Sequence, residues 1–402
     1  MPAGRPARRG NGQEFRFRAE SDYVYLTGDA TAGGVLVVEP DGEATLYLDA
    51  PLGRVDLRFF NDYEHGDFWV GSRPALADVE DVLGLRCRPR DKLPEDLRGD
   101  GLRTRVARSI DAEVDALVEA GDPFPDRELR AVVSELRLVK DAWEIEQIEA
   151  AIATTVRGFE DVGRGLSSFN GERRVETAFV ARARNDGNDA AFNPIAASGA
   201  HATTLHWMRN DGPLRPGDLL LLDAGAESPT LYSADLTRTY PVSGTYSESQ
   251  RRMIELVNDA IDEALAAVAP GRPFRDFHRA VAATLAAGLA DWGLVPAGAP
   301  VDDLHRRYTV CPPGHMLGLD VHDCPHARAA TYLDGVLEPG HVLTVEPGLY
   351  FQADDLTLPE ELRGVGVRIE EDVVVTETGC RNLSEALPRR AGDVEEWIAR
   401  LE

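Results

Sequence analysis

Two aspartates lie in neighbouring segments of strand type near the middle of the sequence. Asp223 falls at the end of GDLLLLDAG and Asp235 lies inside LYSADLTRTYPVSG, with Glu227-Ser228-Pro229 between them as a predicted turn. A hairpin over these segments would place the two carboxylates side by side. Because unpaired carboxylates at close range repel one another and raise each other's pKa, a bound pair of metal ions is the simplest way to neutralise them.

Three further potential ligands follow in similar settings. His315 lies in GHMLGLDVHD, Glu346 in HVLTVEPGLY and Glu370 in GVRIEEDVVVT, and the two glutamates lie on predicted strands. Together with the aspartates they form an oxygen-rich set with a single imidazole. Such a set suits paired Mn, Co or Fe ions better than a thiolate zinc site does.

These motifs carry a family resemblance. DAG, ADLTRTYPVSG, GHMLGLDVHD, TVEPGLYF and GVRIEEDVVVT follow one another in the order found in the aminopeptidase P and prolidase family of pita-bread metallopeptidases. The sequence resembles that family over nearly its whole length. The resemblance implies an α/β (α+β) fold, in which a C-terminal pita-bread catalytic domain follows a smaller, shortened N-terminal α/β domain.

The resemblance also implies two divalent metal ions per chain, with Mn as the first choice and Co, Fe or Zn as alternatives. One ion would be held by Asp235, His315 and Glu370, the other by Asp223, and Glu346 and Glu370 would lie near both. Metal ions so placed lower the pKa of water and polarise a scissile carbonyl.

Several residues match catalytic positions of the family. Glu346 is expected to accept the proton of the attacking water and pass it to the leaving nitrogen. His206 in ATTLHW and His322 in LDVHD match histidines that bind substrate and stabilise the tetrahedral intermediate, although each could instead make a structural hydrogen bond. Arg368, two residues before Glu370, matches an arginine near the active site, and pairing with carboxylates is its equal alternative.

The substrate-binding set adds three positions to His206 and His322. Tyr350 is expected to form a wall of the site or donate a hydrogen bond there, with a place in the core as its alternative. Two positions depart from the family pattern. Cys311 stands where a histidine usually lines the proline pocket, and Phe192 stands where many members carry a tyrosine. Pocket shape and rate are therefore the properties that these departures affect.

The expected activity is hydrolysis of the Xaa-Pro bond, with release of the N-terminal residue of peptides that have proline second. A Xaa-Pro dipeptidase, or prolidase, is the alternative, and a non-catalytic pita-bread binding protein is a remote third. Because relatives without metal chemistry lose several of the five ligands and this sequence retains all of them, the binding role is the least favoured.

Length and composition set further bounds. The 402 residues predict two domains, and we place them at 1–125 and 126–402, with the Pro-containing stretch 120–128 as linker. The first domain is expected to be shortened because its family word FRFRAESDYVYLTG begins almost at once, after a loose basic segment over 1–14. The formal net charge of −26 argues against nucleic acid and anionic membranes as partners.

Cysteine usage and hydropathy predict the compartment. The 4 cysteines show no CxxC spacing, no apolar run has the length of a membrane helix, and no signal-peptide core is present. We expect a cytoplasmic protein that acts on proline-containing peptides. The resemblance implies a homodimer or homotetramer.

Three helices are predicted around the ligand-bearing strands. One long amphipathic helix is expected over 129–162, a second over Ser247–Ala269 with Ser247 and Gln250 as its capping box, and a third over Pro273–Trp292.

Overall fold

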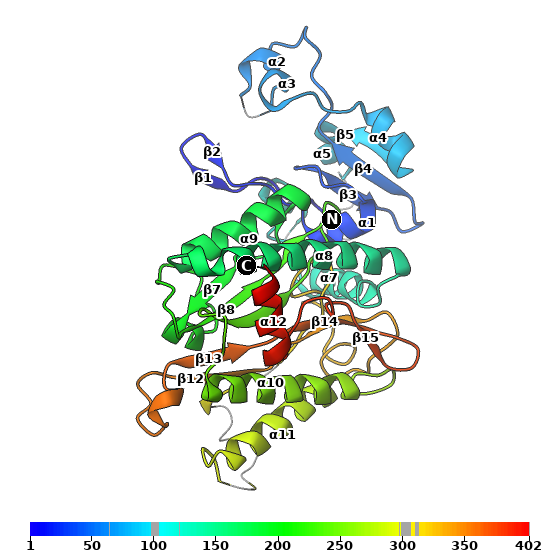
Figure 1. Cartoon of the computed structure of the whole chain (residues 1–402). Coiled ribbons are helices and arrows are strands. Elements are labelled where there is room, and N and C mark those ends of the chain that lie inside the picture. Colours follow the sequence, from blue (N-terminus) through cyan, green and yellow to red (C-terminus); the bar gives the residue numbers. More distant parts are fainter. Residues whose placement is uncertain are drawn as a thin grey trace. The chain divides into compact units, whose positions relative to one another are not determined.

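The computed structural model describes residues 1–63, 65–97, 104–119, 121–296, 298, 307–309 and 313–401. The chain divides into two compact units, Met1–Ser134 and Glu135–Glu402, whose elements are labelled in Figure 1. Both units mix helices and strands, which confirms the α/β class. The assignment of domains to 1–125 and 126–402 stays a prediction.

The first unit is built on a small mixed sheet. Strand β3 (Val35–Val38) pairs antiparallel with β4 (Ala44–Leu48), which pairs parallel with β5 (Arg86–Pro89). Tyr23, Leu36 and Leu46 are buried against one another in its core. The other elements of this unit are β1 (Arg8–Gly10), β2 (Gln13–Glu14), α1 (Ser21–Thr27), α2 (Arg58–Asn61), α3 (Asp67–Val70), α4 (Leu76–Leu83), η1 (Arg90–Lys92), α5 (Leu93–Asp96) and α6 (Ala112–Leu117).

The start of the chain is ordered, so the expectation of a loose segment over 1–14 was wrong. Ala3 is buried in the core and its N–H donates to the carbonyl of Gly34 at 2.8 Å. The N–H of Leu36 donates to the carbonyl of Met1 at the same distance of 2.8 Å. The basic, Gly- and Pro-rich composition did not indicate that the first residues pair beside β3.

Three sheets form the centre of the second unit. The first has the order β10 (Leu236–Pro241), β8 (Leu219–Ala224), β7 (Ile195–Ser198), and the second β11 (Val342–Val345), β14 (Glu371–Val375), β15 (Cys380–Asn382). The third pairs β12 (Gly348–Phe351) with β13 (Val365–Arg368). A short pair of β6 (Asp189–Ala190) and β9 (Ala226–Glu227) lies beside the turn between β8 and β10. Because β8 and β10 pair antiparallel, the predicted hairpin is confirmed.

Helices lie on both sides of these strands in Figure 1. Helices α8 (Ala142–Gly165) and α9 (Glu172–Asp186) lie on one side, and α10 (Glu248–Ala267) and α11 (Arg275–Asp291) on the other. Helix α10 begins with the predicted capping box of Ser247 and Gln250. The remaining elements are η2 (Leu166–Ser168), η3 (Gly199–Thr203), η5 (Glu360–Leu362) and α12 (Ala391–Leu401). In the part of the chain described, no helix is long and apolar enough to span a membrane.

The single long helix expected over 129–162 is two helices, so that prediction was wrong. Helix α7 (Phe124–Leu136) begins inside the expected linker, and α8 begins at Ala142 after a break. Two cations of the break, Arg137 and Lys140, are buried against Asp323, with Lys140 Nζ 2.7 Å from Asp323 Oδ2. Because a buried cation requires a partner, this long-range pairing overrides the helical pattern.

We predict that Asp323→Asn lowers the free energy of unfolding by about 3–5 kcal/mol, because it leaves buried Lys140 without its carboxylate and Arg137 paired with the partly exposed Asp320. Burial alone would raise the pKa of Asp323, but Lys140 and Arg137 hold it well below its ordinary range. Urea denaturation measures the loss. The matched control is Asp320→Asn, since Asp320 also contacts Arg137 but its side chain is 36% exposed. Its expected cost is below about 1 kcal/mol, and equal losses in the two variants would contradict the prediction.

Stability should also fall in acid because of His341. Burial lowers the pKa of His341 from 6.5 to about 4, and the charge of Lys140 adds to the effect. Between these values the unfolded chain binds a proton that the folded chain does not, so stability is lost as pH falls from 6.5 to 4. We expect the difference in unfolding free energy between wild type and His341→Gln to change by about 3 kcal/mol across this window. A constant difference would refute it.

Candidate metal centre

The β8–β10 hairpin places Asp223 and Asp235 on one face. Asp223 lies opposite Thr237 in the register, and Asp235 precedes Thr237 by two residues, so all three side chains point the same way. The hairpin strands cross closely at Gly225. A Cβ there would lie 1.7 Å from the carbonyl oxygen of Ala234, which only glycine can avoid.

Three further segments carry the other predicted ligands to this face. Glu370 lies between β13 and β14, and its N–H donates to the carbonyl of Thr237 at 3.0 Å. The N–H of Glu346 donates to the carbonyl of Pro313 at 2.9 Å, and the carbonyl of His315 accepts from Thr344 at 2.8 Å. The histidine segment is therefore paired beside β11.

Three of the five predicted ligands form a compact cluster. Asp235, His315 and Glu370 each offer one donor atom, and these atoms all lie within 4.8 Å of one another. His315 Nε2 is 3.4 Å from Asp235 Oδ2 and 3.6 Å from Glu346 Oε1. Its other nitrogen, Nδ1, is 3.0 Å from the carbonyl oxygen of Met316, which leaves Nε2 facing the carboxylates.

Arg368 connects the fifth predicted ligand to the cluster. Its Nη2 lies 2.5 Å from Asp223 Oδ2, and its Nη1 donates to the hydroxyl of Tyr350 at 3.0 Å. Its Nε donates to the hydroxyl of Thr237 at 3.3 Å. Arg368 therefore does pair with a carboxylate, and through that pair it lies at the site together with Tyr350.

The electrostatics of the cluster are unfavourable without a cation. Burial, together with the charges of neighbouring carboxylates, raises the pKa of Asp223 to about 6 and that of Glu346 to about 7. Burial and the charge of Asp235 raise the pKa of Glu370 well above its ordinary value. Burial would lower the pKa of His315, but Asp235 and Glu346 raise it to about 9. In this environment the carboxylates resist ionising together.

The donor atoms fit a divalent metal. Asp223 Oδ1 and Glu370 Oε1 are buried, and neither has a hydrogen-bond partner within the described residues. Buried polar atoms are rarely left unsatisfied, so such an atom requires an explanation. A cation bound by carboxylate oxygens and one imidazole explains both atoms, since hard oxygen donors suit Mn, Co and Fe.

The predicted histidines lie beside this cluster. The rings of His315 and His322 meet edge to face, with centroids 4.4 Å apart. Burial lowers the pKa of His322, and the charges of His315 and His206 lower it further. His206 is exposed. His322 is therefore neutral near pH 7 in the absence of metal, and it lies within electrostatic reach of His206.

The two departures from the family pattern have different outcomes. Phe192 is half-buried, and its Cε1 lies 3.2 Å from the place of a Cβ on Gly225, two residues from Asp223. Its ring is thus next to the hairpin that carries both aspartates. Cys311 lies outside the described residues, so its predicted place in the proline pocket stays a prediction.

Sequence reasoning missed two residues that hold the ligands. Thr237 donates its hydroxyl to Glu370 Oε2 at 2.8 Å. Asp372 is fully buried, and its Oδ2 accepts the N–H of Asp235 at 3.0 Å. A signal was present, because each lies two residues along a strand from a predicted ligand and so shares its face.

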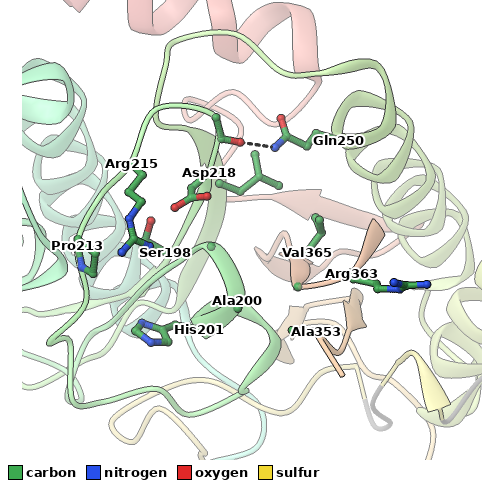
Figure 2. A pocket seen from close by; sticks show the side chains of 14 residues that line it. Ser198, Ala200, His201, Pro213, Arg215, Asp218, Gln250, Ala353, Arg363 and Val365 are labelled. Atoms are coloured by element: carbon green, nitrogen blue, oxygen red, sulfur yellow. Dashed lines mark hydrogen bonds between the residues drawn. The ribbon is translucent and has the colours of Figure 1, made fainter. Parts of the chain in front are cut away.

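A separate pocket, shown in Figure 2, lies at the opposite end of β7. It has a volume of about 480 Å³ and contains none of the predicted site residues. Ser198 on its wall pairs with Leu220, whereas Asp223 pairs with Ile195 at the other end of the same strands. Its lining includes Ser198, His201, Arg215, Asp218, Gln250 and Arg363.

Family models match both parts of the chain. Residues 146–377 match metallopeptidase family M24, and residues 1–104 match the aminopeptidase P N-terminal domain. Curated relatives include Xaa-Pro aminopeptidase 1 of Streptomyces coelicolor, which is 51% identical over 412 residues, spanning 100% of this chain and 83% of the relative. The Xaa-Pro aminopeptidase of Haemophilus influenzae is 35% identical over 398 residues, spanning 96% of this chain and 90% of the relative.

Solved structures agree with this grouping. A Pseudomonas aeruginosa aminopeptidase superposes with a TM-score of 0.85 at 28% identity, covering 100% of this chain and 93% of that one. Escherichia coli aminopeptidase P with the inhibitor Pro-Leu gives a TM-score of 0.87 at 27% identity, with the same coverage of 100% and 93%. These similarities extend over the whole chain.

We predict opposite effects of Glu370→Gln on the metal-free and the metal-loaded protein. Because the pKa of Glu370 is raised in the folded protein, its ionisation opposes folding at any pH above its ordinary value of 4.5. Without metal, the free energy of unfolding of the variant at pH 7 should therefore exceed that of wild type by at least about 1 kcal/mol. Thermal unfolding with and without Mn measures both effects. For each ion bound, wild type should gain about 2.7 kcal/mol when free Mn is 100 times the Kd.

The variant should lose most of this Mn-dependent gain. Glu338→Gln is the matched control, since Glu338 is exposed and lies just before β11. An equal Mn-dependent gain in wild type and Glu370→Gln would contradict a metal site at Glu370.

Proposed function

The chain belongs to metallopeptidase family M24 and is a metallopeptidase, and from this premise we propose a dinuclear-metal-dependent Xaa-Pro aminopeptidase. It releases the N-terminal residue of peptides with proline at the second position. The observation that carries the proposal is a pair of buried oxygens on Asp223 and Glu370 that have no hydrogen-bond partner among the described residues, at a site shared with Asp235, His315 and Glu346. The name shared by the Streptomyces and Haemophilus relatives supports the substrate class.

The proposed metal ligands are the five residues of this site, and Mn is the proposed metal. Two divalent ions bound there would lower the pKa of water and polarise the scissile carbonyl. Arg368 holds Asp223 Oδ2 and leaves Oδ1 for a metal. Thr237 likewise occupies Glu370 Oε2 and leaves Oε1. Each carboxylate is thus oriented by one hydrogen bond, and its other oxygen would be available to hold a metal ion.

Glu346 is the proposed general base and acid. Its side chain is 24% exposed, and without bound metal burial raises its carboxyl pKa to about 7. A carboxylate within reach of the attacking water can accept its proton and return it to the leaving group. Glu346 would take the proton of the attacking water and deliver it to the proline nitrogen, which must be protonated to leave.

The histidines and Tyr350 are proposed to contact the substrate. His322 is neutral near pH 7, so it donates one N–H to the carbonyl oxygen of the scissile bond as negative charge develops there. His206, which is exposed beside it, would bind the peptide. Tyr350 accepts from Arg368, and its own O–H remains to donate toward the site. Phe192 and Cys311 are proposed to shape the proline pocket.

A cytoplasmic location and a homodimer or homotetramer stay predictions. The prolidase alternative differs only in the length of peptide accepted. The aminopeptidase and prolidase activities can be distinguished with the intact chain.

The test compares a Xaa-Pro dipeptide with a Xaa-Pro-Xaa tripeptide in the presence of Mn, following the amino acid released. Cleavage of the tripeptide is the expected result. Cleavage of the dipeptide alone would replace the proposal with prolidase. Failure to cleave either substrate with metal bound would reject a Xaa-Pro peptidase.

We predict that Glu346→Gln lowers kcat by about 10²–10⁴-fold, because the amide can neither accept nor return the proton. Metal content by elemental analysis separates loss of proton transfer from loss of metal. The control is again Glu338→Gln, which should retain wild-type kcat. A Glu346→Gln enzyme that keeps wild-type kcat would remove Glu346 from the mechanism.

A further inference from the structure

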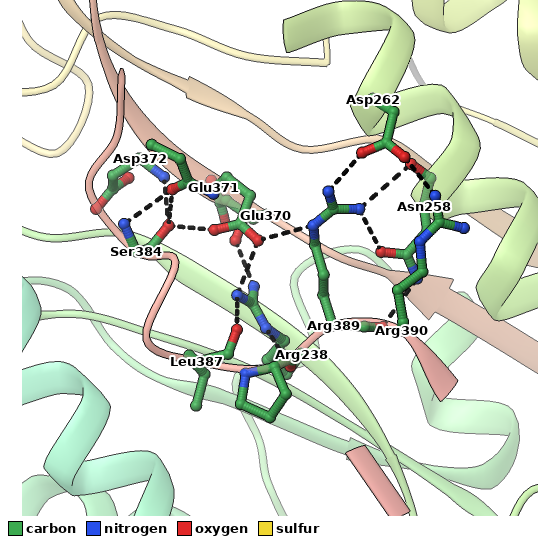
Figure 3. A network of polar contacts seen from close by, with 12 residues as sticks. Arg238, Asn258, Asp262, Glu370, Glu371, Asp372, Ser384, Leu387, Arg389 and Arg390 are labelled. Atoms are coloured by element: carbon green, nitrogen blue, oxygen red, sulfur yellow. Dashed lines mark hydrogen bonds and ion pairs between the residues drawn. The ribbon is translucent and has the colours of Figure 1, made fainter. Parts of the chain in front are cut away.

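A fully buried guanidinium lies behind the metal centre. Arg238 follows Thr237 on β10 and is 1% exposed. Because side chains alternate along a strand, it points away from the face that carries Asp235 and Thr237. Figure 3 shows its guanidinium among the residues that follow Arg368 and those near the C-terminal end of the chain.

Two of its hydrogen bonds are made to the backbone of segments that carry proposed metal ligands. Its Nη1 donates to the main-chain carbonyl of Glu370 at 2.6 Å and to that of Thr237 at 3.0 Å. One nitrogen therefore joins β10 to the residue between β13 and β14. The same two residues meet on the other face, where the hydroxyl of Thr237 donates to Glu370 Oε2.

The remaining hydrogen bonds join this point to a distant segment. Nη2 donates to Glu371 Oε1 at 2.9 Å and to the carbonyl of Leu387 at 2.7 Å, and Nε donates to the carbonyl of Pro388 at 3.0 Å. An arginine side chain has five N–H donors, and these five acceptors use all of them. No other side chain can supply this number of donors in a planar fork.

Glu371 extends the contacts along β14. Its side chain and that of Arg238 are each 1% exposed, and its Oε2 accepts from the hydroxyl of Ser384. The oxygen of Ser384 in turn accepts the N–H of Asp372 at 3.1 Å. Asp372 is the residue whose carboxylate holds the N–H of Asp235. Both metal-facing strands are thus fixed from behind by one buried polar network.

We propose that Arg238 is a positioning residue for metal binding. It fixes the backbone of Glu370 and Thr237, and so sets the distance and direction from which Glu370 Oε1 meets the metal. The inference rests on the proposed function, because the ligand role of Glu370 belongs to that proposal. Residues that orient ligands change metal affinity by about 10–100-fold when they are replaced.

A purely structural role for Arg238 makes a different prediction. Loss of its hydrogen bonds would then lower the melting temperature and leave the affinity of the folded protein for metal unchanged. Lysine tests the distinction, because it keeps the charge but has three donors on a single atom and cannot join all five acceptors.

The experiment titrates Mn into metal-free wild type, Arg238→Lys and Arg390→Met, and reads free Mn by electron paramagnetic resonance. The temperature is one at which circular dichroism shows each protein to be folded. Arg390→Met is the matched control, because Arg390 lies in the same segment and pairs with Glu255 and Asp259 on α10. We expect the Kd of Arg238→Lys to rise about 10–100-fold. That of Arg390→Met should stay within about threefold.

Wild-type Kd in folded Arg238→Lys, at whatever melting temperature, would overturn the proposal. If Arg238→Lys does not fold, Glu371→Gln decides, since the amide keeps one acceptor for Arg238 and removes the ionic pair. A raised Kd in that variant supports the proposal, and an unchanged Kd rejects it. Absence of Mn binding by wild type would reject the proposed function itself, which is a distinct result.

Discussion

The repulsion among buried carboxylates is the constraint on which the second unit depends. Asp223, Asp235, Glu346 and Glu370 converge where water is largely excluded, and burial raises the pKa of Asp223, Glu346 and Glu370 because ionising them there is costly. Arg368 offsets part of the charge from one side. The negative charge that remains favours the binding of divalent cations. A site of this kind lowers the stability of the metal-free protein, because burying charge is costly, and raises its affinity for metal ions.

The strands make this convergence possible because each contributes only one or two of the predicted ligands. The β8–β10 hairpin supplies two aspartates, the end of β11 supplies Glu346, and the junction of β13 and β14 supplies Glu370. Hydrogen bonds between segments, such as that from Glu370 N–H to the carbonyl of Thr237, fix their spacing. Helices lie on both sides of these strands (Figure 1).

The local part of this design can be read from the sequence. The hairpin and the capping box of α10 follow from alternation and from short-range signals, and the ligand set follows from its family motifs. Contacts between residues that are far apart in the sequence cannot be predicted from local sequence patterns. The break between α7 and α8 is stabilised by Asp323, far along the chain, and Met1 and Ala3 are held by backbone hydrogen bonds to Leu36 and Gly34. The two-residue spacing places Thr237 and Asp372 on the face of the predicted ligands, but it does not give their hydrogen-bond partners, which lie far along the chain.

The hydrogen bonds from Arg238 to the carbonyls of Leu387 and Pro388 have a consequence for folding during synthesis. A chain emerging from the ribosome presents Asp223 and Asp235 long before the carbonyls that complete the contacts of Arg238. Domains fold as units during synthesis, so a domain whose last contacts lie near its C-terminal end becomes competent late. The hydrogen bonds of Arg238 to this segment can therefore form only after Pro388 has been translated.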